Sequence, residues 1–220
     1  YEISLGLVGS EMCIRDSKYT DACIGQFLDY LEGKKLLEGS LIIVTADHGH
    51  AFMEHGRFAH AYDILYNEVI HVPLIMFGLG RQIVNSNVQL LDLPPTILSL
   101  LGIKRPPTFI GKSLFDRKEK PEAIFSESAK PDLINLRYDL NKNAVSCIKG
   151  KFKLIFNELR GTKELYDLES DFQERNNLFD SESEICKELL SLIDKHLLNE
   201  YAYKMKLNKA SEINKVSHRQ

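Results

Sequence analysis

The stretch that decides the fold reads Leu41-Ile42-Ile43-Val44-Thr45-Ala46-Asp47-His48-Gly49. Its continuous apolar run, residues 41–45, is typical of a strand that is covered on both faces, as in a parallel sheet. An acid and an imidazole follow directly where this strand ends. In open α/β sheets, ligand sites gather at the carboxyl ends of the strands. The stretch therefore predicts an α/β fold with a functional site beside Asp47 and His48.

The segments on either side of this strand supply further elements of the same fold. Apolar residues recur at helical spacing over 21–37, and Gly39 and Ser40 are expected to end that helix. Residues 72–77 form a second apolar run and predict the next strand. Asp92 stands before two prolines, a pattern that predicts a helix with Asp92 as its capping residue. We therefore expect a partial mixed or parallel sheet with flanking helices.

After about residue 120 the sequence pattern changes to short strands separated by turn residues, followed by an amphipathic helix. This pattern predicts a small antiparallel sheet with a helix. The expected organisation is an α/β portion over 18–120, this subdomain over 121–203 and a basic tail over 204–220. The expected strands are 123–126, 144–148, 151–156 and 164–168, and the expected helix is 182–203.

Composition narrows the possible partners. The chain has 220 residues, of which 44% are hydrophobic, and this suits one globular domain, or a domain with a small appendage. A formal charge of −3 is too small to indicate nucleic acid as a partner, and no apolar run approaches membrane-spanning length. The four cysteines show no zinc-ligand spacing. The compartment is left open.

The first residues look foreign to the rest of the chain. Residues 7–16, LVGSEMCIRD, resemble the translation of a sequencing adapter. We therefore predict that residues 1–17 are not native and exclude them from the fold prediction, as is done for expression scars. The natural start of the gene is then expected to lie elsewhere.

Four residues carry the predicted chemistry. The carboxylate of Asp47 and a neutral imidazole of His48 can share a divalent cation. His55 and His60 follow in a polar loop, and either could bind an anionic ester oxygen or protonate a leaving group. The alternative is structural, with Asp47 capping a turn and the histidines hydrated at the surface.

In their order and spacing, several segments resemble the sulfatase family, within the alkaline-phosphatase-like superfamily. The resemblance implies that Asp47 and His48 are the second pair of metal ligands, usually for one Ca²⁺. It also places His60 where many members have a lysine that contacts the sulfate, and His55 at a common family residue, so His55 and His60 are the expected catalytic residues. The matching segments are DACIG (21–25), VTADHG (44–49), EHG (54–56), LYNE (65–68), VPLI (72–75), LDLPPT (91–96), GKSL (111–114) and ELYDL (164–168) with 174–178.

The resemblance further implies a formylglycine nucleophile, made from a Cys or Ser in a C/S-x-P/A-x-R setting. None of the four cysteines has that setting, so we expect the nucleophile and the first metal-ligand pair in a missing N-terminal part. The expected function is that of a fragment of a metal-dependent sulfatase, inactive alone, whose substrate is a sulfated small molecule or glycan.

Two other functions remain open. One is a phosphoesterase or phosphoethanolamine transferase of the same superfamily, and the other is a non-catalytic metal-binding module.

Overall fold

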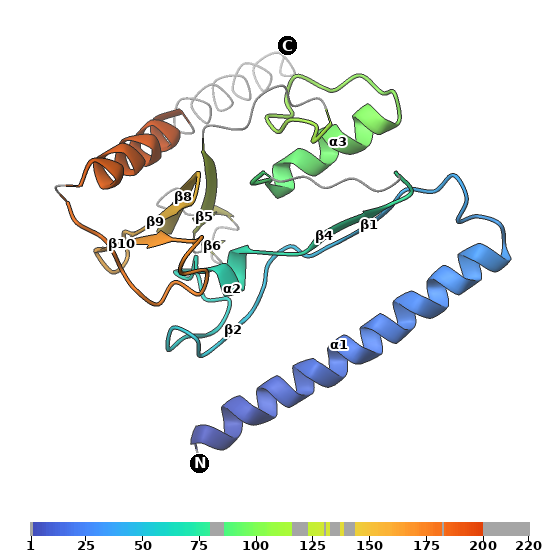
Figure 1. Ribbon diagram of the computed structural model, residues 1–220, viewed down its shortest axis with the longest axis horizontal. Helices are drawn as coiled ribbons and strands as arrows, with labels where there is room; N and C mark the ends of the chain where they lie inside the picture. Colours follow the sequence, from blue (N-terminus) through green and yellow to red (C-terminus); the bar gives the residue numbers. More distant parts are fainter. Residues whose placement is uncertain are drawn as a thin grey trace, which may run out of the picture. The chain divides into compact units, whose positions relative to one another are not determined.

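The computed structural model of the chain describes residues 2–79, 86–115, 123–129, 131–132, 137–138, 144–181 and 183–199. The chain divides into two units, Tyr1–Lys120 and Pro121–Gln220 (Figure 1). The basic tail predicted over 204–220 lies outside the described residues. No helix of the described part is long and apolar enough to cross a membrane.

A long helix, α1 (Glu2–Gly33), begins the first unit (Figure 1). It contains most of the predicted helix, but the prediction that Gly39 and Ser40 end it is wrong. The helix stops earlier because Lys35 adopts a left-handed backbone conformation (φ 56°) and the N–H of Leu36 turns back to the carbonyl of Leu31 at 2.8 Å. The helix also runs through residues 2–17, whose adapter origin stays a prediction.

Strands β1 (Ile42–Thr45) and β4 (Leu74–Phe77) confirm the two predicted strands of this unit. They pair antiparallel, with Ile42 opposite Phe77, so the parallel pairing favoured by the apolar run is wrong for these strands. The chain makes an excursion over 46–73 and returns in the opposite direction, and this connection sets the strand direction. Ile75 and Phe77 are exposed, so among the described residues the pair is not covered on both faces.

The excursion between these strands forms a small substructure of its own. A short hairpin joins β2 (Ala51–Phe52) to β3 (Phe58–Ala59), and a single helical turn, α2 (Asn67–Ile70), follows. Ala51 packs with Ile64 and Val69 in a small buried cluster. The predicted polar loop is therefore an ordered hairpin anchored by α2.

Asp92 lies where the predicted helix starts, between a 3-10 turn, η1 (Leu90–Asp92), and α3 (Leu93–Leu100). Its carboxylate does not cap α3, which corrects the prediction. It accepts instead from the backbone N–H groups of Gln89 (3.0 Å) and Lys112 (2.9 Å). The side chain is buried, and these two hydrogen bonds supply its carboxylate with donors. They also connect the loop at Lys112 to the start of α3.

The second unit contains the predicted antiparallel sheet with a helix. Its four strands lie in the order β10-β9-β8-β5, and every pair in this sheet is antiparallel. A helix over 184–199 follows the sheet in the chain. The strands are β5 (Ile124–Ser128), β8 (Ala144–Lys149), β9 (Phe152–Asn157) and β10 (Thr162–Asp167), and a two-residue ribbon, β6 (Pro131–Asp132) and β7 (Arg137–Tyr138), lies between β5 and β8 in sequence.

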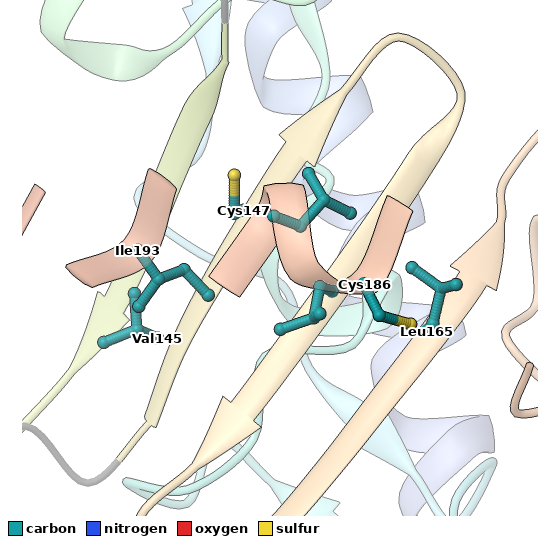
Figure 2. Packing of buried hydrophobic residues seen from close by; sticks show 7 residues of the cluster. Val145, Cys147, Leu165, Cys186 and Ile193 are labelled. Carbon is teal, nitrogen blue, oxygen red and sulfur yellow. The ribbon is translucent and has the colours of Figure 1, made fainter. Parts of the chain in front are cut away.

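This helix packs its apolar side on the sheet. Figure 2 shows Cys186 and Ile193 of the helix in one cluster with Val145, Cys147 and Leu165 of the strands. The amphipathic pattern of the sequence is therefore used to close a core.

A buried ion pair lies in the same unit. The Nζ of Lys153 is 2.6 Å from Oε1 of Glu174, and both side chains are fully buried. A buried charge needs such a partner, because leaving it alone in an apolar interior is costly.

Apolar side chains are distributed unequally between the units. Among the described residues, only four of the buried hydrophobic residues belong to the first unit, namely Ala51, Ile64, Leu65 and Val69. Most of the exposed large hydrophobic residues lie in that unit, on α1, on β4 and around α3. The second unit thus has its own core, whereas the first leaves much of its apolar surface in water.

Candidate functional site

Asp47 and His48 lie just beyond the end of β1, as the sequence predicted. Both side chains reach solvent, with 88% of Asp47 and 42% of His48 exposed. Oδ1 of Asp47 accepts from the backbone N–H of His48 at 2.9 Å, while Oδ2 lies 3.8 Å from Nε2 of the same residue. The turn at the strand end therefore brings the carboxylate and the imidazole to one side.

The tautomer of His48 follows from its other ring nitrogen. Nδ1 lies 2.8 Å from the carbonyl oxygen of Gly49, and a carbonyl can only accept, so Nδ1 carries the hydrogen. In the neutral ring, Nε2 then holds the free lone pair, and it is the nitrogen on the Asp47 side. In a histidine that binds a metal through one ring nitrogen, the N–H of the other typically donates to a carbonyl in this way.

Gly49 fixes this turn against α2. Its N–H donates to the carbonyl of Val69 at 2.7 Å. A Cβ at this position would stand 2.1 Å from the carbonyl oxygen of Glu68, so only glycine permits the approach. Asp47 and His48 are thus held by backbone contacts, although their side chains are exposed.

His60 comes to the same place from the far end of the hairpin. Its ring centroid lies 4.3 Å from that of His48, with 31° between the ring planes. A third imidazole, His50, lies 5.6 Å from His60 and 5.2 Å from Phe52. The structure therefore groups the predicted residues Asp47, His48 and His60, and it adds His50, which sequence reasoning did not single out.

A sequence signal for His50 existed in the alternation around the hairpin. Ala51 pairs with Ala59 and Phe52 with Phe58, so His50 and His60 occupy the next opposing positions. The ring of His50 contacts the rings of Phe52, Phe58 and His60, so both histidines and both phenylalanines gather on one side of the hairpin. That inference needs the register, which the sequence alone does not supply.

His55 has a different set of contacts. Its Nδ1 lies 2.6 Å from Oε1 of Glu68, and its ring stacks on Tyr66 with centroids 3.7 Å apart and 7° between the planes. Both side chains of the His55–Glu68 pair are only 13% exposed. This geometry braces the hairpin loop on α2, and whether His55 also has a catalytic role stays a prediction.

Arg57, the basic residue of this loop, also forms an ion pair. Its Nη2 donates to both carboxylate oxygens of Asp63, at 2.6 and 2.7 Å. The guanidinium therefore has a carboxylate partner before any anionic ligand arrives.

The described residues bring two candidate metal ligands together at this place. Among residues 13–79, 86–115 and the later described segments, no group of three His, Cys, Asp or Glu could hold an ion. Two ligands on one Ca²⁺, each at about 2.4 Å, can lie as far apart as Nε2 of His48 and Oδ2 of Asp47 do. The spacing of the pair is therefore compatible with part of a cation site.

Comparisons with known sequences identify relatives for this arrangement. The sulfatase family model matches residues 13–103. Arylsulfatase K of Mus musculus is 32% identical over 170 residues, which cover 72% of this chain and 30% of that protein. Arylsulfatase K of Homo sapiens is 37% identical over 99 residues, which cover 43% of this chain and 18% of that protein. The chain thus spans less than a third of the length of these relatives.

Solved structures show the same fold. BT4656, determined in complex with its substrate D-glucosamine-2-N,6-O-disulfate, matches with a TM-score of 0.63 and 26% identity, over 80% of this chain and 37% of its own. A phosphonate monoester hydrolase from Silicibacter pomeroyi matches with a TM-score of 0.64 and 22% identity, over 83% of this chain and 38% of its own. The expected alkaline-phosphatase-like fold class is confirmed.

Proposed function

Because this chain belongs to the sulfatase family over residues 13–103, we propose that it carries part of the active site of a metal-dependent sulfatase. In this proposal Asp47 and His48 are two ligands of one divalent cation, and His60 contacts an oxygen of the sulfate ester. Family membership supports the reaction class, sulfuric ester hydrolysis.

One observation carries the metal assignment. The Nδ1–H of His48 donates to a backbone carbonyl, which leaves the lone pair of Nε2 on the side of the Asp47 carboxylate, 3.8 Å away. A turn cap with a surface histidine would not need this pairing. Donor chemistry alone suits either Ca²⁺ or a transition metal, because carboxylates favour the first and imidazoles the second. The family resemblance favours Ca²⁺.

The roles of the chain's own residues follow from their positions. A bound cation would neutralise charge on the transferred sulfuryl group. His60 is exposed beside His48, so an ester oxygen near the cation could accept a hydrogen bond from its ring. The Gly49–Val69 hydrogen bond holds the strand end, which keeps the two ligand side chains in place.

The proposed substrate is a sulfate ester of a small molecule or a glycan. BT4656 was solved with a disulfated glucosamine, which supports a sulfated substrate for this fold. The fold by itself does not separate sulfate from phosphonate or phosphate esters, since the phosphonate monoester hydrolase shares it. The similarity to arylsulfatase K favours sulfate.

We further propose that this chain does not complete the reaction alone. It covers 30% of mouse arylsulfatase K, and its described residues offer two ligands for the cation. The exposed apolar residues of the first unit support the same view, because a complete catalytic domain would bury such surface. We expect the purified chain to show no hydrolysis of 4-nitrophenyl sulfate, and metal-dependent turnover would contradict this.

The metal assignment is tested by calorimetric titration of the 220-residue chain with Ca²⁺ and, separately, with Zn²⁺. Asp47→Asn keeps the size of the side chain and removes the charged ligand. We expect it to weaken binding of the ion by at least about tenfold.

Asp29→Asn is the matched control, because it removes the same charge from an exposed position on α1. Equal affinities for the wild type and Asp47→Asn would contradict the assignment. A chain that binds the cation through Asp47 but does not bind 4-nitrophenyl sulfate would favour the non-catalytic metal-binding module.

A further inference from the structure

We propose that His50 is a positioning residue that fixes the ring of His60 over His48. The inference rests on the proposed function, in which His60 contacts the sulfate ester. It adds a residue that neither the sequence pattern nor the family resemblance assigned.

The hairpin places the two imidazoles at opposing positions of its strands. Ala51 is opposite Ala59 in the β2–β3 register, so the positions just outside this pair are His50 and His60. Their ring centroids lie 5.6 Å apart at an interplanar angle of 61°, which is an edge-to-face contact. Cross-strand pairs of this kind stabilise one relative placement of the two side chains.

His50 is itself held on two further sides. Its ring lies 5.2 Å from Phe52 and 5.7 Å from Phe58, the latter at 89°. Ala51, the residue after it, is fully buried against α2 and anchors this strand. His50 is therefore the fixed member of the pair, half-buried, whereas His60 is exposed.

The backbone conformation of the residue before His60 also restricts where the His60 side chain can lie. Ala59 has φ of 65°, in the left-handed region that alanine rarely occupies. Such a conformation persists where surrounding contacts hold it, and it turns the chain so that His60 follows toward His48. The ring of His60 then has two imidazole neighbours, His48 at 4.3 Å and His50 at 5.6 Å between centroids.

Loss of His50 would leave His60 with more rotamers to sample before it can meet a ligand. Immobilising such a side chain on binding costs about 0.5–1.5 kcal/mol, which corresponds to a roughly two- to twelvefold change in affinity. The expected effect is therefore moderate and specific to ligands that His60 contacts.

The experiment uses the full chain with Ca²⁺, labelled with ¹³C at histidine, and 4-nitrophenyl sulfate as the probe. Dissociation constants come from NMR titration, and the His48–His60 ring contact from nuclear Overhauser effects. We expect His50→Ala to weaken probe binding about two- to twelvefold and to remove the ring contact. His50→Phe keeps an aromatic edge against His60 and should restore both.

His60→Ala separates the two hypotheses. If it weakens probe binding while His50→Ala changes neither binding nor the His48–His60 contact, the positioning role is wrong and the proposed function stands. If His60→Ala leaves probe binding unchanged, the proposed contact with the ester is wrong, and the positioning role fails with it. The urea midpoint of each variant shows whether a change in probe binding is caused by loss of folding. If His50→Phe restores neither probe binding nor the His48–His60 contact, the inference is wrong.

Discussion

Replacing Gly49 by alanine tests whether the turn after β1 depends on a backbone contact. The added Cβ would lie 2.1 Å from the carbonyl oxygen of Glu68, whereas ordinary contacts begin at 3.4 Å. The backbone of α2 must therefore retreat by about 1.3 Å from the strand end. This movement lengthens the 2.7 Å hydrogen bond from Gly49 to Val69 beyond its useful range.

The magnitude follows from these two losses. Overpacking against backbone costs about 1–3 kcal/mol, and one lost hydrogen bond costs about 1 kcal/mol. We expect Gly49→Ala to lower the free energy of unfolding of the first unit by about 2–4 kcal/mol. The Ca²⁺ affinity should fall as well, because the ring of His48 is anchored on the carbonyl of Gly49.

Urea unfolding followed at the ¹³C signals of His48 and His60 measures the first unit without the second. Gly25→Ala is the matched control, since a Cβ there meets no atom within 4 Å and the residue lies inside α1. In a helix interior this change stabilises by about 0.5–1 kcal/mol. If Gly49→Ala keeps the wild-type midpoint and Ca²⁺ affinity, the backbone contact does not hold the site.

Three other predictions concern stability and surface. Lys153→Met should lower the free energy of unfolding in urea by about 3–5 kcal/mol, because it removes the ammonium group that balances the buried Glu174 carboxylate. Adding Glu174→Leu should recover most of the loss, and no loss in the single variant would contradict the pairing. The hydrogen bond from Lys151 lowers the pKa of Asp167 from 3.8, so its stabilisation is present above that value and lost as pH falls through the folded-state pKa. Asp167→Asn should therefore flatten the acid limb of stability against pH, and an unchanged limb would refute this. Ile75→Lys should reduce binding of the dye ANS without lowering the urea midpoint, since 61% of Ile75 is exposed; unchanged dye binding would exclude β4 as the apolar surface.

Local sequence patterns predicted most of the elements, and long-range contacts decided what they could not predict. The apolar run ending at Thr45 identified β1, but the direction of its pairing depends on how the chain returns over 46–73. Asp92 was recognised at a helix start, yet its carboxylate bonds to Lys112, 20 residues later in the sequence. A capping pattern covers only the next turn and cannot reveal such a partner.

The candidate site shows the same division. The adjacency of Asp47 and His48 after a strand suggested a metal-ligand pair, which stays a prediction, and spacing suggested His60. The pairing of His55 with Glu68 joins residues 13 positions apart, and the contact of His50 with His60 follows from the hairpin register. Both depend on how the 46–73 segment folds back, so periodicity alone could not have predicted them.

The difference between the two cores predicts where proteases would cleave this chain and where chaperones would bind it. Many apolar side chains of the first unit are already exposed to solvent, so its local unfolding exposes little additional apolar surface. The free energy of local unfolding is therefore low there. Unfolding of the second unit would separate its helix from the sheet and expose the buried cluster that contains Leu154 and Leu189. Limited digestion of the native chain should therefore nick the first unit early and leave a resistant fragment made of the second. A chaperone that recognises exposed hydrophobic segments would bind the first unit as well.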